Sequence, residues 1–231
     1  MVAREDHVLL FSDFDQIEMR VMAHLAKDQG LINAFTQYED FFSHLGSEIY
    51  HDPAFTKKDP RRPVVKNTGY CTIYGGGVEK IAATAKVSVE EAEYVYSRFN
   101  ELYPNVSKFM MEVIKEGKQK LNAEGKAYTR SPLTNRLLVA DDDRVYALTN
   151  YMIQGTAAEL IKTKLIQLDM AGLGEYMILP VHDEVILDVP RYAARDAVET
   201  IKSIMNDDKI FSVPVTAGIA YGERWGEKVE L

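Results

Sequence analysis

The sequence is short of cysteine and of long apolar runs. Its 231 residues include a single cysteine, Cys71, so no internal disulfide can form and the chain fits a reducing cytosol. No apolar run approaches the roughly 20 residues that a membrane-spanning helix needs, so we expect no such helix. The opening, MVAREDHVLL, lacks the basic segment, apolar core and cleavage site of a signal peptide. These absences argue against a secreted or membrane-embedded protein.

Basic residues are also in the minority. The chain has 27 Lys and Arg against 35 Asp and Glu, a formal net charge of −8. A protein that only coats nucleic acid normally carries a basic balance, so this class is disfavoured. An enzyme with a local basic groove is not excluded, because acids at a metal site and on the opposite face of the protein would dominate the net charge. The remaining composition, 46% hydrophobic and 27% charged, is that of a globular chain of one large or two small domains.

Hydrophobic periodicity predicts an α+β fold. A short apolar run at 8–11 indicates a buried strand, and the pattern becomes helical from Gln16. Ser88 and Glu91 have the spacing of a helix-capping box. Further helices are predicted over 61–75, 88–102, from 104 to about 121, from 141–143 to 168, and over 197–205. Extended segments are predicted within 126–139 and over 213–220. Together these elements indicate a small antiparallel sheet, built from distant segments, with a mostly helical insertion.

The stretch LPVHDEVILDVP, residues 179–190, predicts a hairpin with His182, Asp183 and Glu184 at its tip. Adjacent carboxylates at a tight turn repel each other unless a counter-charge is present. A divalent cation such as Mg²⁺ prefers carboxylate oxygens and would supply that charge. The alternative is a solvated turn in which the acids sit in water at little cost, with His182 in a structural role.

The stretch SDFDQIEMR, residues 12–20, follows the first predicted strand. The strand would hold the Asp13 carboxylate at a sheet edge with little freedom, and Glu18 and Arg20 would follow on the first turns of a helix. A strand cap followed by a solvated helix start is the alternative interpretation.

The stretch RPVVKNTGYCTIYGGG, residues 62–77, places Arg62, Lys66, Tyr70 and Tyr74 at successive i, i+4 positions. Two cations followed by two aromatic rings on one helix face suit a nucleotide, with cations for phosphates and a ring for base and sugar. The alternative is a helix with a solvated basic end and tyrosines in the core. The glycines are turn residues, because no phosphate-loop pattern is present.

Together these stretches resemble DNA polymerase family A. D-F-D-Q-I-E-M-R-V-M-A-H-L-A is similar to its first palm motif, R-x-x-x-K-x-x-x-Y-x-x-x-Y-G to its fingers helix, and V-H-D-E to its second palm motif. N-Y-M-I-Q-G-T-A-A-E-L, residues 150–160, resembles the helix before the hairpin, and G-I-A-Y-G-E-R-W resembles the last strand. The motifs occur in the family's order and cover nearly the whole chain.

The resemblance implies an α+β fold with a palm-type antiparallel sheet and a large helical fingers insertion, without thumb and exonuclease domains. Residues 1–26 would form the first palm segment, 27–173 the fingers and connecting helices, and 174–231 the second palm segment. The implied activity is template-directed, two-metal nucleotidyl transfer from dNTPs to a primer 3′-OH. Two Mg²⁺ ions, with Mn²⁺ as an alternative, would be held by Asp13, Asp183 and the Phe14 carbonyl. Glu184 would be an auxiliary catalytic acid.

The resemblance also assigns the substrate contacts. Arg62 and Lys66 would hold the β- and γ-phosphates, Tyr70 would stack on the incoming nucleotide, and Tyr74 would lie beside the templating position. Glu18 would block a ribose 2′-hydroxyl. The full implied nucleotide-binding set is Gln16, Glu18, Arg62, Lys66, Tyr70 and Tyr74. The implied primer-template contacts are Arg136, Asn150, Gln154 and His182.

Several positions depart from the family's pattern, among them Gly69-Tyr70-Cys71, which stands where Asn-Phe-Gly is common. Asp15 replaces a small Ser, and Phe42 stands where relatives often carry a His near the phosphates. Tyr70 replaces a common Phe, which leads to the hypothesis that its hydroxyl fills the place of a missing sugar 3′-OH, so that dideoxynucleotides are accepted.

The implied partners are primer-template DNA, dNTPs and a thumb supplied by a separate polypeptide or by an N-terminal portion, in the cytoplasm of a bacterium or phage-infected cell and with no membrane. Two alternatives remain, a catalytically silent assembly subunit with this fold and a single-subunit RNA polymerase fragment.

Overall fold

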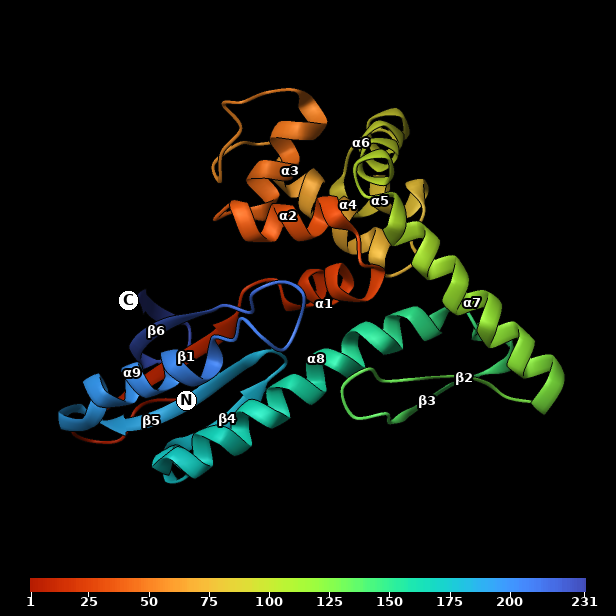
Figure 1. Cartoon of the computed structure of the whole chain (residues 1–231). Helices are drawn as coiled ribbons and strands as arrows, with labels where there is room; N and C mark the ends of the chain where they lie inside the picture. Colours follow the sequence, from red (N-terminus) through yellow and green to blue (C-terminus); the bar gives the residue numbers. More distant parts are fainter. The chain divides into compact units, whose positions relative to one another are not determined.

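The computed structural model describes all 231 residues, which form two compact units. Unit 1 comprises Met1–Ile17 and Ala157–Leu231, and unit 2 comprises Glu18–Thr156. The chain passes between them within helices α1 (Ile17–Ala26) and α8 (Ala147–Leu168) (Figure 1). These boundaries differ from those of the segments 1–26, 27–173 and 174–231, whose assignment as palm and fingers stays a prediction. No helix combines the length and apolar character needed to cross a membrane.

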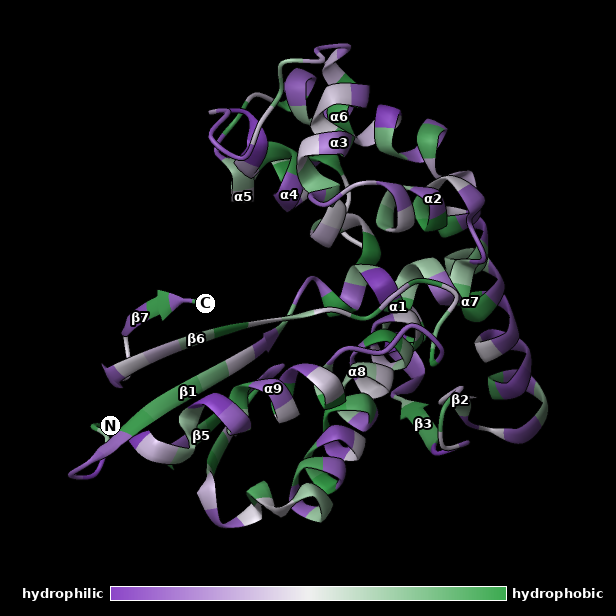
Figure 2. Cartoon of the chain, turned by 60° about the vertical axis from the view of Figure 1, so that its left-hand side comes forward, coloured by the Kyte–Doolittle hydropathy of each residue, from purple (hydrophilic) through white to green (hydrophobic).

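Unit 1 is built on a five-stranded antiparallel sheet of order β4-β5-β1-β6-β7. Its strands are β1 (His7–Phe14), β4 (Met177–Val181), β5 (Glu184–Pro190), β6 (Ala217–Arg224) and β7 (Glu227–Glu230). The strands come from both ends of unit 1's sequence, and the central strand β1 is hydrophobic along most of its length (Figures 1 and 2). The predicted antiparallel sheet from distant segments is confirmed.

The two faces of this sheet differ because side chains alternate along a strand. Leu9 and Phe11 pack with Ile186 and Ala220 on one face. Helix α9 (Ala194–Met205) contacts β1, β5 and β6, and its residue Val198 lines a cavity together with Leu10. Asp13 follows Leu9 and Phe11 at two-residue intervals along β1, so its side chain lies on the same face of the sheet as theirs.

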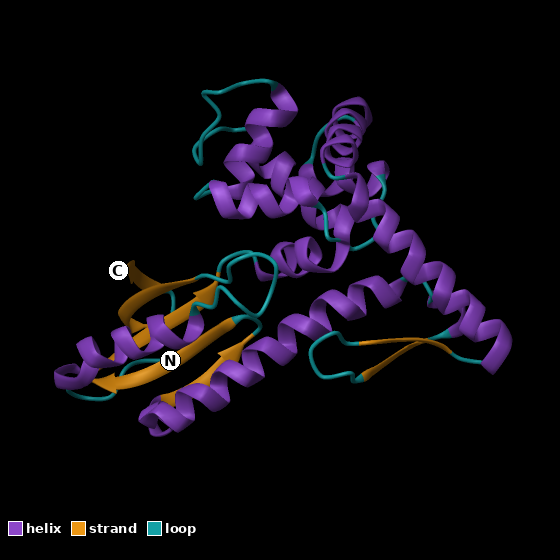
Figure 3. Ribbon diagram, in the orientation of Figure 1, coloured by secondary structure: helices purple, strands orange, loops and turns teal.

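Unit 2 is mainly helical, with one two-stranded hairpin (Figure 3). Its further helices are α2 (Gln29–Gln37), α3 (Phe41–Tyr50), α4 (Arg62–Ile73), α5 (Val78–Ala85), α6 (Val89–Leu102) and α7 (Pro104–Glu124). The hairpin is β2 (Ala127–Arg130) with β3 (Leu137–Ala140). Short helical turns cover Asp142–Arg144 in this unit and Asp169–Leu173, Gly174–Tyr176 and Arg191–Ala193 in unit 1.

Local chemistry explains where several helices begin. The Ser88 hydroxyl accepts a hydrogen bond from the Glu91 backbone N at 3.1 Å, which confirms the predicted cap of α6. Asp28 and Asp40 cap α2 and α3 in the same way. Pro63 lies in the first turn of α4, where a missing backbone N–H costs nothing.

Two predicted boundaries are wrong. The acids at 141–143 do not begin α8. They lie in and just before a separate short turn, and α8 starts at Ala147. The last long strand spans Ala217–Arg224 rather than 213–220. Val213 and Val215 are buried, but Val215 pairs only through an isolated bridge to Asp207, so the apolar pattern here reflects burial and not strand pairing.

Candidate active site at the end of the central strand

The last residues of β1 lie beside the hairpin formed by β4 and β5. Asp13 is in register with Glu184 on one side and with Gly218 on the other. The Phe14 backbone N donates to the Asp183 carbonyl at 3.3 Å. Residues 170 positions apart in the sequence therefore meet at one end of the sheet, as the sequence predicted for Asp13 and Asp183.

The turn of this hairpin contains only His182 and Asp183. Val181 pairs with Glu184, so Glu184 is the first residue of β5 rather than part of the tip, which corrects the sequence prediction. His182 adopts a left-handed backbone with φ of 57°, a conformation that His tolerates better than most residues. The three side chains consequently differ in exposure, with His182 exposed, Asp183 half-buried and Glu184 buried.

The carboxylates perturb one another. Burial, followed by the neighbouring charges of Asp183 and Glu184, raises the pKa of Asp13 to about 6. The part of the shift that follows burial comes from carboxylates that repel one another because too little positive charge lies nearby. A hard divalent cation would remove the repulsion, so the donor set fits a metal such as Mg²⁺. No group of three or more His, Cys, Asp and Glu side chains is arranged to hold an ion, and a site here would need backbone or substrate oxygens as well.

Sequence reasoning missed one cation at this end of the sheet. The Lys228 ammonium on β7 donates a hydrogen bond to Glu184 and lies 4.6 Å from the centre of the Phe11 ring. Its positive charge opposes the rise in the pKa of Asp13. The charged strand EKVE gives no sequence signal for this contact, because the pairing of β7 with β6 brings Lys228 to the site.

Asp15, two residues after Asp13, is hydrogen-bonded to Thr216. The Thr216 hydroxyl donates to the Asp15 carboxylate at 2.8 Å, and the Asp15 backbone N donates to the Thr216 carbonyl at 2.9 Å. The additional acid therefore has a hydrogen-bond donor of its own, although its charge still contributes to raising the pKa of Asp13. Gln16, predicted to bind nucleotide, has a left-handed backbone with φ of 52° and a buried side-chain oxygen without a hydrogen-bond partner.

In unit 2, α4 presents the predicted row of cations and rings. The Lys66 ammonium lies 5.9 Å from the centre of the Tyr70 ring, and the Tyr70 and Tyr74 rings are 6.5 Å apart and nearly parallel. Lys66 is exposed, while Tyr70 and Tyr74 are half-buried, so neither tyrosine belongs fully to the core. The helix itself ends at Ile73, and Tyr74 is its cap residue.

Tyr74 links this row to α1 and α8. Its hydroxyl donates a hydrogen bond to the Glu18 carboxylate, and Gln154 hydrogen bonds the same hydroxyl. Burial and the Glu18 contact raise the pKa of Tyr74, which keeps the phenol protonated. Three residues from distant motifs thus form one hydrogen-bonded group.

Arg62, the first residue of the row, has a partner that sequence reasoning also missed. Its Nη2 donates to the Asp40 Oδ1 at 2.8 Å, and its guanidinium lies 5.8 Å from the centre of the Phe42 ring. Phe42 is 1% exposed and also packs against Tyr70, with ring centres 5.7 Å apart. An Asp directly before an apolar helix signals an N-cap in the sequence, but not this ion pair.

The predicted DNA contacts are distributed over both units. Asn150 and Gln154 lie one turn apart on α8, and Asn150 has a buried side-chain oxygen without a partner. The exposed Arg136 approaches the same helix, since a Cβ on Gly155 would come within 3.2 Å of its guanidinium. These three lie in unit 2, whereas His182 lies in unit 1.

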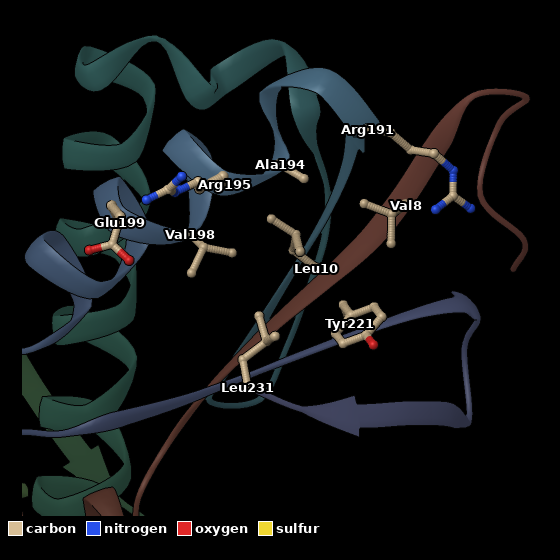
Figure 4. A pocket seen from close by; sticks show the side chains of 9 residues that line it. All are labelled: Val8, Leu10, Arg191, Ala194, Arg195, Val198, Glu199, Tyr221 and Leu231. Atoms are coloured by element: carbon tan, nitrogen blue, oxygen red, sulfur yellow. The ribbon is translucent and has the colours of Figure 1, made fainter.

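A cavity between α9 and the sheet of unit 1 contains none of the predicted site residues. Its volume is about 360 Å³, with Leu10, Val198, Tyr221 and Leu231 among its lining (Figure 4). Val8 and Leu10 point into it from β1, on the face opposite Leu9 and Phe11.

Comparisons with known proteins agree on one family. The model of DNA polymerase family A matches residues 1–227. The DNA polymerase of Mycobacterium phage D29 is 31% identical, over 90% of this chain and 33% of that protein. DNA polymerase I of Streptococcus pneumoniae serotype 4 is 32% identical, over 96% of this chain and 26% of that protein.

A solved structure matches as well. The POL domain of Pol1 from M. smegmatis, in complex with a DNA primer-template and dNTP, superposes with a TM-score of 0.82 and 29% identity. The match covers 97% of this chain and 41% of that one. The chain therefore spans about a third or less of the two curated relatives, and less than half of the matched structure.

Proposed function

This chain belongs to DNA polymerase family A, and from that premise we propose that it forms the palm and fingers of a template-directed DNA polymerase. In the reaction, the primer 3′-oxygen bonds to the α-phosphorus of a dNTP and pyrophosphate leaves. Unit 1 would be the palm and unit 2 the fingers. The observation that carries the proposal is the meeting of Asp13 with the Asp183–Glu184 hairpin, where burial and then the neighbouring acids raise the pKa of Asp13 to about 6.

Asp13, Asp183 and the Phe14 carbonyl would hold two Mg²⁺ ions, with Mn²⁺ as an alternative. When bound, these ions would lower the pKa of the attacking 3′-hydroxyl and neutralise charge on the phosphates. Glu184 would act as an auxiliary acid, with its charge already balanced in part by Lys228.

The row on α4 would bind the incoming nucleotide. Arg62 and Lys66 would contact the β- and γ-phosphates, since Arg and Lys donors suit phosphate oxygens. Tyr70 would stack on base and sugar, with Phe42 packed behind it. Because the transfer is in-line, positioning of the triphosphate would supply much of the catalysis.

Sugar selection would rest on Glu18. Its hydrogen bond from Tyr74 fixes the carboxylate, so a ribose 2′-hydroxyl would meet a rigid group rather than a mobile one. Gln16 would complete the nucleotide-binding set, and Tyr74 would lie beside the templating base.

Primer-template contacts would come from Arg136, Asn150, Gln154 and His182. Three of these share one part of unit 2, which supports a common strand-tracking role. A thumb, from a separate polypeptide or an N-terminal portion, would add the remaining grip on the duplex.

Primer extension tests this function. The chain is incubated with primer-template, Mg²⁺ and either dNTPs or rNTPs, with and without a thumb-bearing polypeptide of the family. We expect dNTP-dependent extension that Asp183→Ala abolishes. Extension with rNTPs would instead favour the RNA polymerase alternative.

The silent-subunit alternative has its own outcome. It would be favoured by no extension under any condition, together with DNA binding that Asp183→Ala leaves unchanged.

A further inference from the structure

We propose that Asp40 is a positioning residue for the incoming triphosphate, holding the Arg62 guanidinium by one edge so that its other donors face the phosphates. This inference rests on the proposed function and adds a residue that none of the family-like motifs contains. Asp40 and Arg62 both lie in unit 2, 22 positions apart in the sequence.

Asp40 is itself rigidly held. Its Oδ2 accepts from the Ser43 backbone N at 3.2 Å and from the Ser43 hydroxyl, which caps α3. Its Oδ1 remains for Arg62, so the two oxygens have separate tasks. Burial alone would raise the pKa of Asp40, but the hydrogen bonds from Ser43 and Arg62 outweigh it and lower the pKa. The lowered pKa keeps Asp40 ionised, and its side chain is only 11% exposed.

Arg62 is only partly satisfied by this contact. Its Nη2 is bonded to Asp40, while its buried Nε has no hydrogen-bond partner. A guanidinium has five N–H donors, so most of its donor capacity is not used by Asp40. Phe42 lies beneath the group and gives it an apolar support.

The preceding residue shows the contrast. Arg61 donates to Asp59 through Nε and Nη2 at 2.9 and 2.7 Å, and to Asp52 at 2.5 Å. It also lies over the rings of Tyr50 and Phe55. Arg61 is thus held by two carboxylates in the loop before α4, whereas Arg62 is tied by a single carboxylate and keeps donors for a ligand.

The expected effect on triphosphate affinity depends on the cost of ordering the Arg62 side chain. A free arginine must be immobilised when it binds phosphate, and a carboxylate that has already fixed it removes much of that cost. Loss of the tie should weaken triphosphate binding roughly three- to tenfold. The chemical step should change little, because Arg62 binds the leaving phosphates in the ground state as well.

The test uses Asp40→Asn and Asp40→Ser, both of which retain a good N-cap for α3. Asp59→Asn is the matched control, since it makes the same charge change on an acid that also accepts a backbone N–H and is paired with the adjacent arginine. The measurements are dTTP titration of the chain bound to a dideoxy-terminated primer-template in Mg²⁺, dTTP KM and kcat in single-nucleotide extension, and thermal unfolding.

We expect both Asp40 variants to raise the Kd and KM for dTTP about three- to tenfold with kcat nearly constant, and Asp59→Asn to leave both unchanged. In an Arg62→Gln background, Asp40→Asn should have no further effect on binding. The penalty should also be smaller for dTDP than for dTTP. A merely structural Asp40 would instead lower the unfolding temperature without this dependence on Arg62 and on phosphate number.

Three outcomes would overturn the inference. They are an unchanged dTTP affinity, a tighter affinity that marks Asp40 as a competitor of the phosphates, or an equal penalty in the Arg62→Gln background. A wild-type chain that binds dTTP and extends primers while the Asp40 variants behave normally sinks this inference alone. A wild-type chain that neither binds dTTP nor extends primers, even with the thumb-bearing polypeptide present, sinks the proposed function and this inference with it.

Discussion

Asp13 is a residue whose proposed role in metal binding opposes its effect on the stability of the metal-free chain. Its carboxylate is held by the central strand next to two further acids, with only Lys228 as a nearby counter-charge. Burial and this crowding destabilise the metal-free chain at neutral pH, because the native state disfavours the ionised form of Asp13. The same crowding is useful where divalent metal is to bind, so stability and function should respond in opposite directions to its removal.

Asp13→Asn should therefore stabilise the metal-free chain and abolish extension. The folded pKa of about 6 lies above the ordinary 3.8, so between these values the native state binds more protons than the unfolded chain. The contribution of Asp13 to the free energy of unfolding consequently falls as pH rises from 4 to 6. In thermal scans in EDTA, the variant should exceed the wild type by a few degrees above pH 6 and converge with it near pH 4. Parallel profiles at every pH would contradict the assignment.

Asp183 and Glu184 should not be equally important. Asp183 lies in the turn and is half-buried, whereas Glu184 is buried in β5 and paired with Lys228. We expect Asp183→Ala to lower kcat by at least about a hundredfold, as loss of a group that stabilises transition-state charge does. Glu184→Ala should lower it by roughly tenfold. Single-turnover extension measures both, and equal losses would show that this division is wrong.

Tyr70 offers a test of sugar discrimination. Its hydroxyl could take the place of an absent sugar 3′-OH, since Tyr70 is half-buried and its ring is supported by Phe42. Tyr70→Phe should then raise the KM for dideoxynucleotides relative to deoxynucleotides roughly tenfold, the order of one lost hydrogen bond. Competitive extension with ddTTP and dTTP measures the ratio. Unaltered dideoxy termination would refute the role of the hydroxyl.

At the scale of elements, prediction succeeded where the cause is local. The Ser88–Glu91 cap and the apolar spacing of α6 are contained in one turn of sequence, so that helix could be predicted. The helices α2 and α3 were not predicted, although Asp28 and Asp40 cap them. Strand β6 was misplaced because its exposed end is defined by pairing with β1, as in Gly222 with Leu9.

The site residues also divide into those with a local sequence signal and those that depend on contacts between distant segments. Motif residues such as Asp13 and Asp183 could be named because chemistry and family resemblance agree on them. The ion-pair partners of Glu184 and Arg62, which are Lys228 and Asp40, could not be named, since an ion pair between distant segments leaves no local pattern.

The packing between α7 and α8 depends on a missing side chain. A Cβ on Gly117 would lie 2.4 Å from Leu148 and 2.9 Å from Val145, both buried in the core of unit 2. Gly117→Ala should destabilise unit 2 by about 1–3 kcal/mol, since overpacking outweighs the gain in helix propensity. Glu116→Ala, at an exposed position of the same helix, is the control and should leave the unfolding temperature nearly unchanged. Thermal or urea unfolding measures the stability of both variants, and a Gly117→Ala variant more stable than the wild type would contradict the packing argument.

At the scale of the whole molecule, charge and site oppose each other. The chain carries a net charge of −8, yet its proposed substrates are polyanions. Local cations such as Arg62, Lys66 and Arg136 would have to act against the overall repulsion. Non-specific affinity for DNA comes mainly from phosphate contacts, so few such contacts imply weak duplex binding by this chain alone.

The last prediction concerns that binding. A labelled primer-template is titrated with the chain at KCl concentrations from about 25 to about 200 mM, and binding is followed by fluorescence anisotropy. We expect weak binding with a shallow salt dependence. Arg136→Ala should weaken it further and reduce the salt slope by about one, because one phosphate contact is lost. Adding a thumb-bearing polypeptide of the family should strengthen binding and steepen the slope. Tight binding by the chain alone with a steep slope would instead mean that these two units already supply most of the phosphate contacts.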